Sequence, residues 1–280
     1  MLDVGMKGKF FLFSLFCCVF LLSCVPERMA SVHGSVKDHA ATNNSSDFDK
    51  SSQNSEESSQ NNNAVTTDKT ASDNQAMMSE LRRKCLEKQV TDYDGNSYHT
   101  VLVGKQCWLK ENLRATHGRD GKTLNYYVPN GNSANVREYG YLYEWRSAKS
   151  VCPKGWHLPT MEEWEQLEDH VVLLGMSCGD GLQKQVAKAV ASEKGWHSSP
   201  DACAVGYNQQ SNNASGFSIL PAGLYNYEHY NNFGYKANFW SAKEYDAAFA
   251  YSCGISYDNA SLKRFLDSKA SGFSVRCVKD

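Results

Sequence analysis

The chain has 280 residues, with 29 Lys and Arg against 31 Asp and Glu, so its net charge at pH 7 is −2. Without a basic excess it lacks the electrostatic signature of a nucleic-acid-binding protein, and we expect no nucleic-acid partner. Aromatic residues make up 12% of the chain and include 15 tyrosines, which suits a folded core together with an aromatic surface.

The first 23 residues have the pattern of a bacterial export signal. Lys7 and Lys9 precede an apolar run over 10–22 that is too short to span a bilayer comfortably. The run ends in Leu21-Leu22-Ser23-Cys24, which resembles a lipobox. We predict a signal peptide over 1–23, lipid attachment at Cys24, and an outer-membrane lipoprotein that faces the cell surface. The alternatives are an ordinary secretory signal and an uncleaved anchor.

Residues 24–86 are dominated by Ser, Asn, Gln, Thr, Asp and Glu. Few of these side chains can be buried, so order would not offset its entropy cost. We predict a disordered tether with a reach of about 40 Å, ending in a short helical lead-in over 81–88. A domain is then expected over 87–280.

Two runs rich in strand-forming residues, 89–93 and 97–103, flank Asp94-Gly95-Asn96, which predicts a β-hairpin. Asp92 and Asp94 also give this turn some likeness to a calcium loop. No Glu closes it at EF-hand spacing, so the hairpin is the preferred interpretation and no metal is predicted. A structural calcium ion is the alternative.

A turn over 152–160 lies at the centre of the predicted fold. Residues 115–140 are polar and rich in Gly and Asn, which predicts a loop. A short helix is expected over 145–151. Thr160 and Glu163 have capping-box spacing, which places a helix start at the end of the turn. Apolar residues then recur at three- and four-residue steps, which predicts an amphipathic helix ending near 173–175: Trp164, Leu167, Val171 and Leu174.

The last third predicts a second helix and several strands. Leu182, Val186 and Val190 fall one turn apart, which predicts a helix over 181–193. Strands are expected over 216–223, 239–242, 247–256 and 273–278. Together these elements predict a disulfide-stapled α+β domain with two helices and a mostly antiparallel, twisted sheet.

Seven motifs in a fixed order carry a family resemblance: 94–98, 108–113, 139–145, 152–160, 220–223, 239–241 and 274–278. Together they resemble the Fibrobacter succinogenes major paralogous domain over about 87–280, although Cys107 departs from its usual pattern. The resemblance implies an exported surface protein without an assigned molecular function. It also marks structural motif residues: Trp108, Trp145, Trp156, Leu158, Pro159, Thr160, Trp164, Trp240 and Arg276.

A more distant resemblance is to the C-type-lectin-like fold, including the formylglycine-generating-enzyme branch. It implies a Cys152–Cys277 disulfide, whose closed loop would stabilise the fold by about 4 to 5 kcal/mol. A Cys178–Cys203 disulfide is a second expectation. The pairing of three cysteines is left open: Cys85, Cys107 and Cys253.

Enzyme and metal motifs are weak. Enzymes of the lectin-like branch use a cysteine pair or an iron-binding histidine cluster, whereas the six histidines from His99 to His229 are scattered here. Cys253 is open to two interpretations, a reactive thiol and a disulfide cysteine. We therefore expect a non-catalytic domain without a cofactor.

The stretch over 224–238 alternates aromatic residues with asparagines. Aromatic rings stack on sugar rings, and amides bond to sugar hydroxyls; the alternative is that these rings pack beneath an irregular loop. The candidate binding residues are Tyr225, Asn226, Tyr227, Tyr230, Asn232 and Tyr235. We expect a lipid-anchored module that binds a polysaccharide or a surface protein. The alternatives are a structural or assembly component of the cell envelope and a formylglycine-generating-like enzyme.

Overall fold

The computed structural model describes residues 61–87, 89–179 and 184–280. The predicted signal peptide, the lipid attachment at Cys24 and the tether up to residue 60 lie outside the described residues. Within them, no helix combines the length and the apolar character needed to cross a membrane.

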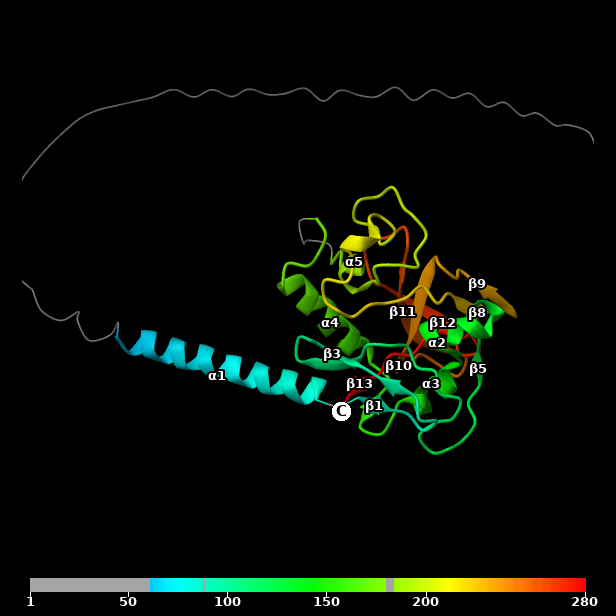
Figure 1. The fold of residues 1–280 in the computed structure, drawn as a ribbon, viewed down its shortest axis with the longest axis horizontal. Helices are drawn as coiled ribbons and strands as arrows, with labels where there is room; N and C mark the ends of the chain where they lie inside the picture. The colour runs from blue at the N-terminus through cyan, green and yellow to red at the C-terminus, as the bar shows by residue number, and fades with distance from the viewer. Residues whose placement is uncertain (1–60, 88, 180–183) are drawn as a thin grey trace, which may run out of the picture. The chain divides into compact units, whose positions relative to one another are not determined.

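The structure differs from the predicted tether over 61–80, which belongs to the helix α1 (Asn61–Leu86) (Figure 1). The helical lead-in predicted over 81–88 is present as the last part of this helix. The second half of this helix contains good helix formers. Glu80 also lies 2.8 Å from the Arg83 guanidinium and 3.5 Å from the Lys84 ammonium, which are helix-supporting pairs three and four residues apart. A disulfide between Cys85 and Cys107 joins the end of α1 to the domain.

A four-stranded antiparallel sheet brings the two ends of the domain together. Its strands are β3 (Thr100–Val103), β4 (Gln106–Leu109), β13 (Val278–Lys279) and β7 (Trp156–His157), in that order. The predicted hairpin is present before it as β1 (Val90–Thr91) and β2 (Ser97–Tyr98). Gly95 in its turn has φ +83°, a conformation that favours glycine.

The predicted helices on either side of the central turn are confirmed as α3 (Trp145–Val151) and α4 (Met161–Leu173). The capping box is formed in both directions. The Glu163 N–H donates to Thr160 Oγ1 at 3.2 Å, and the Thr160 N–H donates to Glu163 Oε2 at 2.8 Å. This local bonding sets where α4 begins.

A second antiparallel sheet contains β10 (Lys236–Glu244), β11 (Phe249–Ser256) and β12 (Lys263–Ser268), in that order. Two small ladders accompany it, one of β5 (Tyr126–Tyr127) with β6 (Leu142–Tyr143) and one of β8 (Leu224–Asn226) with β9 (His229–Asn231). The remaining elements are short: η1 (Pro129–Gly131), η2 (Ser133–Asn135), α2 (Val136–Tyr139), α5 (Ala187–Val190) and η3 (Gln209–Ser211).

The predicted helix over 181–193 is wrong in length. Residues 184–186 are not helical, and α5 is a single turn. The chain leaves the helix because Ala191 pairs with Ile219, and the Ser192 N–H donates to the Ile219 carbonyl at 2.8 Å. The apolar spacing that predicted a helix instead buries Val186 and Val190 in the core.

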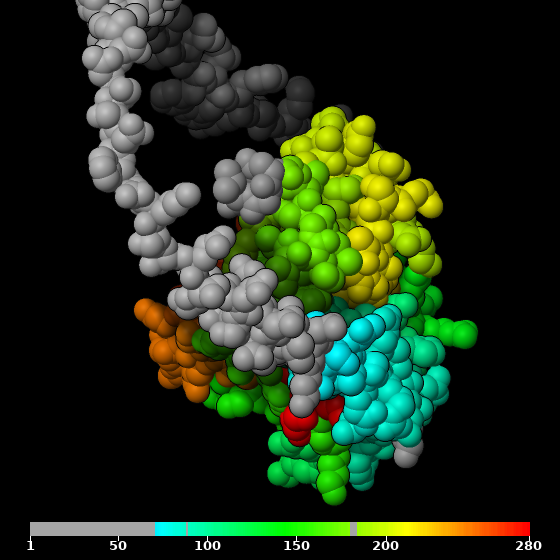
Figure 2. All heavy atoms as spheres, turned by 90° about the vertical axis from the view of Figure 1, so that its left-hand side faces the viewer, coloured from blue at the N-terminus to red at the C-terminus, as the bar shows by residue number. Residues whose placement is uncertain are grey.

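The predicted strand over 216–223 is also wrong, since this segment forms only isolated bridges. Its carbonyl groups have another partner: the buried Arg276 guanidinium donates to the carbonyls of Phe217 and Ser218. The loop region near residue 205, yellow in Figures 1 and 2, lies at the opposite end of the domain from the C-terminus, in red.

Leu158 and the five tryptophans among the structural motif residues belong to two buried apolar clusters. In the first, Trp108 and Trp164 have ring centroids 4.8 Å apart. In the second, Trp240 packs on Phe273 at 4.4 Å, and the Trp145 indole N–H donates to the Ser241 carbonyl at 2.8 Å. Trp156 and Leu158 are buried in this second cluster, and the Pro159 carbonyl accepts from the Ala242 N–H at 2.8 Å.

Three disulfides cross-link the described residues. Cys152 pairs with Cys277 and Cys178 with Cys203, the two pairings expected above, and Cys85 pairs with Cys107. Cys253 is buried without a disulfide partner, and burial raises the pKa of its thiol. Of the two interpretations of Cys253, the disulfide is not formed in the described part of the chain, and burial with a raised pKa disfavours a reactive thiol.

Candidate ligand-binding surface

Three of the four candidate tyrosines, Tyr225, Tyr227 and Tyr230, lie on the hairpin formed by β8 and β9. Tyr225 is paired with Tyr230 across the ladder. Tyr227 and Glu228 occupy the turn with φ 48° and 62°, as in a hairpin turn with two left-handed central residues. This geometry leaves the Tyr227 side chain at the hairpin tip with 90% of its surface exposed.

Tyr225 is fixed from two sides. Its N–H donates to the Gly272 carbonyl at 3.0 Å, and the Gly272 N–H donates back at 2.7 Å. The Tyr127 ring stacks on the Tyr225 ring with centroids 3.7 Å apart. A Cβ at residue 272 would lie 2.5 Å from Tyr127 Cδ2, so the stack requires glycine there. The Tyr127 hydroxyl donates to Glu144 Oε1 at 2.9 Å, and burial together with this carboxylate raises the pKa of Tyr127 to about 12.

A hollow of about 510 Å³ opens beside this stack. We call it the tyrosine hollow. Its lining contains both apolar side chains, aromatic and aliphatic, and polar side chains. The lining residues discussed below are Tyr127, Tyr225, Asn226, Tyr227, Glu228, Phe249, Leu266 and Asp267.

The charged groups of the tyrosine hollow are carboxylates. Glu228 is exposed at the hairpin turn, and Asp267 projects from β12. Burial raises the pKa of Asp267, while the hydrogen bond from the Ser252 hydroxyl at 2.5 Å opposes this shift. The hollow therefore offers hydrogen-bond acceptors beside aromatic rings, which suits a ligand rich in hydroxyl groups.

The structure separates the six candidate residues. Tyr225, Asn226 and Tyr227 line the tyrosine hollow, and the Tyr230 ring lies 5.1 Å from that of Tyr225. Asn232 instead forms a turn with φ 58°. Tyr235 lies elsewhere, because its ring stacks on His197 with centroids 3.7 Å apart.

Sequence reasoning missed several residues of the tyrosine hollow. Tyr127 belongs to a stretch that indicated a loop, and Asp267 belongs to the strand β12, which was not predicted. Tyr127 is placed by stacking on Tyr225, which is distant in the sequence, and Asp267 is placed by the pairing of β12 with β11. The sequence feature that could have indicated Tyr127 as a site residue is the pair of consecutive tyrosines at 126 and 127.

The turn that resembled a calcium loop is bonded internally. Asp92 accepts from the Asn96 N–H at 2.9 Å and from the Tyr98 hydroxyl at 2.6 Å. The Asp94 carboxylate lies 2.6 Å from His117 Nδ1. Protein donors thus occupy these carboxylates. In the described part of the chain, no group of three His, Cys, Asp or Glu residues is placed to hold a metal ion.

Comparison with known proteins identifies a family. The sequence model described as the Fibrobacter succinogenes major domain matches residues 101–279, which is more than half of the chain. No curated protein and no solved structure matches the chain. The matched region includes the central turn, the tyrosine hollow and all of both large sheets except Thr100. The chain belongs to the Fibrobacter succinogenes major domain family.

Proposed function

We propose that this protein is an exported lipoprotein, anchored through lipid at Cys24 in the outer membrane and facing the cell surface. Its domain is a C-type-lectin-like module that binds polysaccharide at the tyrosine hollow without catalysis. The proposed fold agrees with the order of the helix α3, the central turn and the Cys152–Cys277 disulfide.

The observation that carries the binding proposal is that aromatic rings and hydrogen-bonding groups line the same hollow. Tyr225 and Tyr127 form a rigid stack, and Tyr227 stands free at the hairpin tip. Asn226 and Asp267 lie in the same lining. Aromatic faces contact the C–H surface of a sugar ring, while amide and carboxylate groups bond to its hydroxyls.

Packing alone does not account for these side chains. The rings of Tyr127 and Tyr225 are half-buried and do contribute to packing. Tyr227, however, is 90% exposed, and Phe249 and Leu266 on the adjacent strands are 40% and 44% exposed. Exposed apolar groups gathered around one hollow are typical of a binding surface.

A binding assay with the full, oxidised chain tests the proposal. The chain is mixed with insoluble cellulose and with a panel of plant and bacterial glycans. We expect saturable binding that is lost when Tyr225, Tyr227 and Tyr230 are changed together to alanine. A matched control changes two exposed tyrosines away from the hollow, Tyr93 and Tyr207, and should bind as the wild type does.

The outcomes separate the candidate functions. Binding that survives the triple change contradicts the tyrosine hollow as the site. A folded chain that binds no glycan contradicts the polysaccharide proposal and favours a surface protein partner or an assembly role in the envelope. Enzymatic activity is the third alternative, and cleavage of a bound glycan during the assay would favour it.

A further inference from the structure

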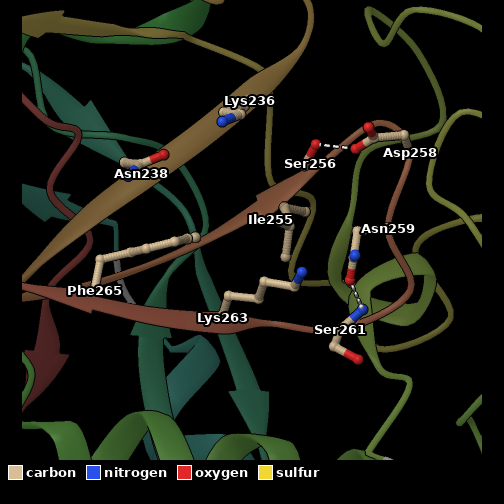
Figure 3. Close-up of a pocket in the computed structure, with 10 residues that line it drawn as sticks. Lys236, Asn238, Ile255, Ser256, Asp258, Asn259, Ser261, Lys263 and Phe265 are labelled. Atoms are coloured by element: carbon tan, nitrogen blue, oxygen red, sulfur yellow. Dashed lines mark hydrogen bonds between the residues drawn. The ribbon is translucent and has the colours of Figure 1, made fainter. Parts of the chain in front are cut away.

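A second hollow, of about 260 Å³, lies on the sheet of β10, β11 and β12 (Figure 3). We call it the lysine hollow. Its size is slightly below the usual range for small-molecule pockets, so it suits a single ring better than a longer ligand. The lining residues that matter here are Lys236, Asn238, Gly254, Asp258, Lys263 and Phe265.

The lysine hollow and part of the tyrosine hollow share one face of this sheet. Lys263, Phe265 and Asp267 alternate along β12, so their side chains point to the same face. Phe265 lines the lysine hollow and Asp267 lines the tyrosine hollow. Two residues along a strand span about 7 Å. A ligand a few sugar units long can therefore contact both hollows.

The floor of the lysine hollow can recognise a sugar. Asn238 is 8% exposed, and Figure 3 shows no hydrogen bond from it to the other lining residues. A Cβ at residue 254 would lie 2.5 Å from the Ala237 carbonyl oxygen and 3.1 Å from Asn238 Oδ1, so the strand contact requires glycine there and no side chain from this position covers the amide. Phe265 is 40% exposed and provides an aromatic surface beside it.

The charge of the lysine hollow differs from that of the tyrosine hollow. Lys236 and Lys263 are both exposed, on β10 and β12. Within the part of the chain that the structure describes, neither forms an ion pair. Asp258, the single acid in the lining, accepts a hydrogen bond from the Ser256 hydroxyl. Two lysines against one carboxylate favour an anionic ligand.

We propose that the lysine hollow binds an acidic sugar unit, bearing a carboxylate or a sulfate, of the same polysaccharide that occupies the tyrosine hollow. This inference rests on the proposed function and specifies its ligand class. Lys236 and Lys263 bind the anionic group, Asn238 bonds to a neighbouring hydroxyl, and Phe265 contacts the ring. The adjacent unit of the chain lies against Tyr225 and Tyr227.

The test compares acidic and neutral glycans that share a backbone type. Binding of the full chain is measured for polygalacturonate against its methyl ester and for dextran sulfate against dextran, which separates carboxylate from sulfate recognition. We expect tighter binding to one or both acidic glycans. Lys236→Gln with Lys263→Gln should weaken that binding about tenfold, with little change for the neutral partner. The matched control, Lys105→Gln with Lys110→Gln, removes two exposed lysines elsewhere and should change neither.

The results distinguish this inference from the proposed function. Equal affinity for acidic and neutral glycans, or no effect of the Lys236 and Lys263 changes, overturns the acidic subsite. If neutral-glycan binding still depends on the three tyrosines, the tyrosine hollow is retained. Absence of any glycan binding overturns both. The variant Phe265→Ser should weaken acidic-glycan binding at high salt as well as low salt, because ring contact is not screened by ions.

Discussion

The Arg276 guanidinium donates a hydrogen bond from Nη1 to the Phe217 carbonyl at 2.6 Å, joining segments that are 59 residues apart. Nη2 donates to the Ser218 carbonyl and Nε to Asn112 Oδ1, each at 2.9 Å. Burial lowers the pKa of Arg276 to about 9, which still leaves it charged at neutral pH. The Arg276 guanidinium therefore satisfies the carbonyl groups of residues 217 and 218, which pair with no strand. It also bonds to the side-chain amide of Asn112.

Replacing Arg276 should destabilise the domain severely. The change Arg276→Met leaves three acceptors without donors, so we expect the free energy of unfolding to fall by about 3 kcal/mol or more. Arg276→Lys should lose nearly as much because an ammonium cannot reproduce the guanidinium geometry. Urea denaturation at pH 7 measures both. The control Arg119→Met removes an exposed arginine, and a loss for Arg276→Met no larger than the control's would contradict this role.

The stability of the domain should depend on pH through His157. Its Nδ1 lies 2.7 Å from Asp280 Oδ1, and its Nε2 lies 2.8 Å from Glu163 Oε1. Burial lowers the pKa of His157, but the two carboxylates raise it by more, so the pKa is above its usual value of 6.5. The imidazole can donate to both carboxylates only when it is protonated.

Because the folded pKa is the higher one, the stabilisation is complete below the unfolded pKa and is lost as pH rises through the folded pKa. We expect the free energy of unfolding to decrease as the pH rises above about 6.5, the usual pKa of histidine. The variant His157→Gln should flatten this dependence, whereas His229→Gln, an exposed control, should preserve it. An unchanged slope in His157→Gln would exclude His157 as its source.

The disulfides should differ in their contributions to stability. Cys152 and Cys277 are separated by 125 residues, and Cys85 and Cys107 by 22. Replacing the first pair by serine should cost about 4 to 5 kcal/mol, which is about 1.5 kcal/mol more than replacing the second pair, since the longer loop restrains the unfolded chain more. Denaturation of both double variants measures the difference, and equal losses would count against a loop-entropy origin.

Two tyrosines of the hairpin should respond differently to substitution. Tyr227→Ala should weaken glycan binding and leave the free energy of unfolding within about 0.5 kcal/mol of the wild type, because its side chain is 90% exposed. Tyr225→Ala should lower both, since its ring stacks on Tyr127. Binding and denaturation measured on the same two variants test this. A stability loss in Tyr227→Ala would indicate a packing role instead.

Local features of this protein follow from its sequence alone. The Thr160 and Glu163 side chains bond to backbone groups three residues apart, and Gly95 supplies the turn conformation of its hairpin. Such features depend on neighbours along the chain, so the capping box, the hairpin and the helix over 145–151 could all be predicted. The ordered motifs likewise predicted the family, and they carried the Cys152–Cys277 pairing through the lectin-like resemblance.

Only the tertiary structure decided how distant segments meet. The sequence gives no reason for Tyr127 to stack on Tyr225, for Tyr235 to leave that group and stack on His197, or for Cys85 to pair with Cys107. It predicted a strand at 216–223 because apolar residues there suit one, whereas Arg276 occupies the carbonyl groups that the strand would use. Local propensities are weak, and contacts made across the folded core outweigh them whenever the two compete.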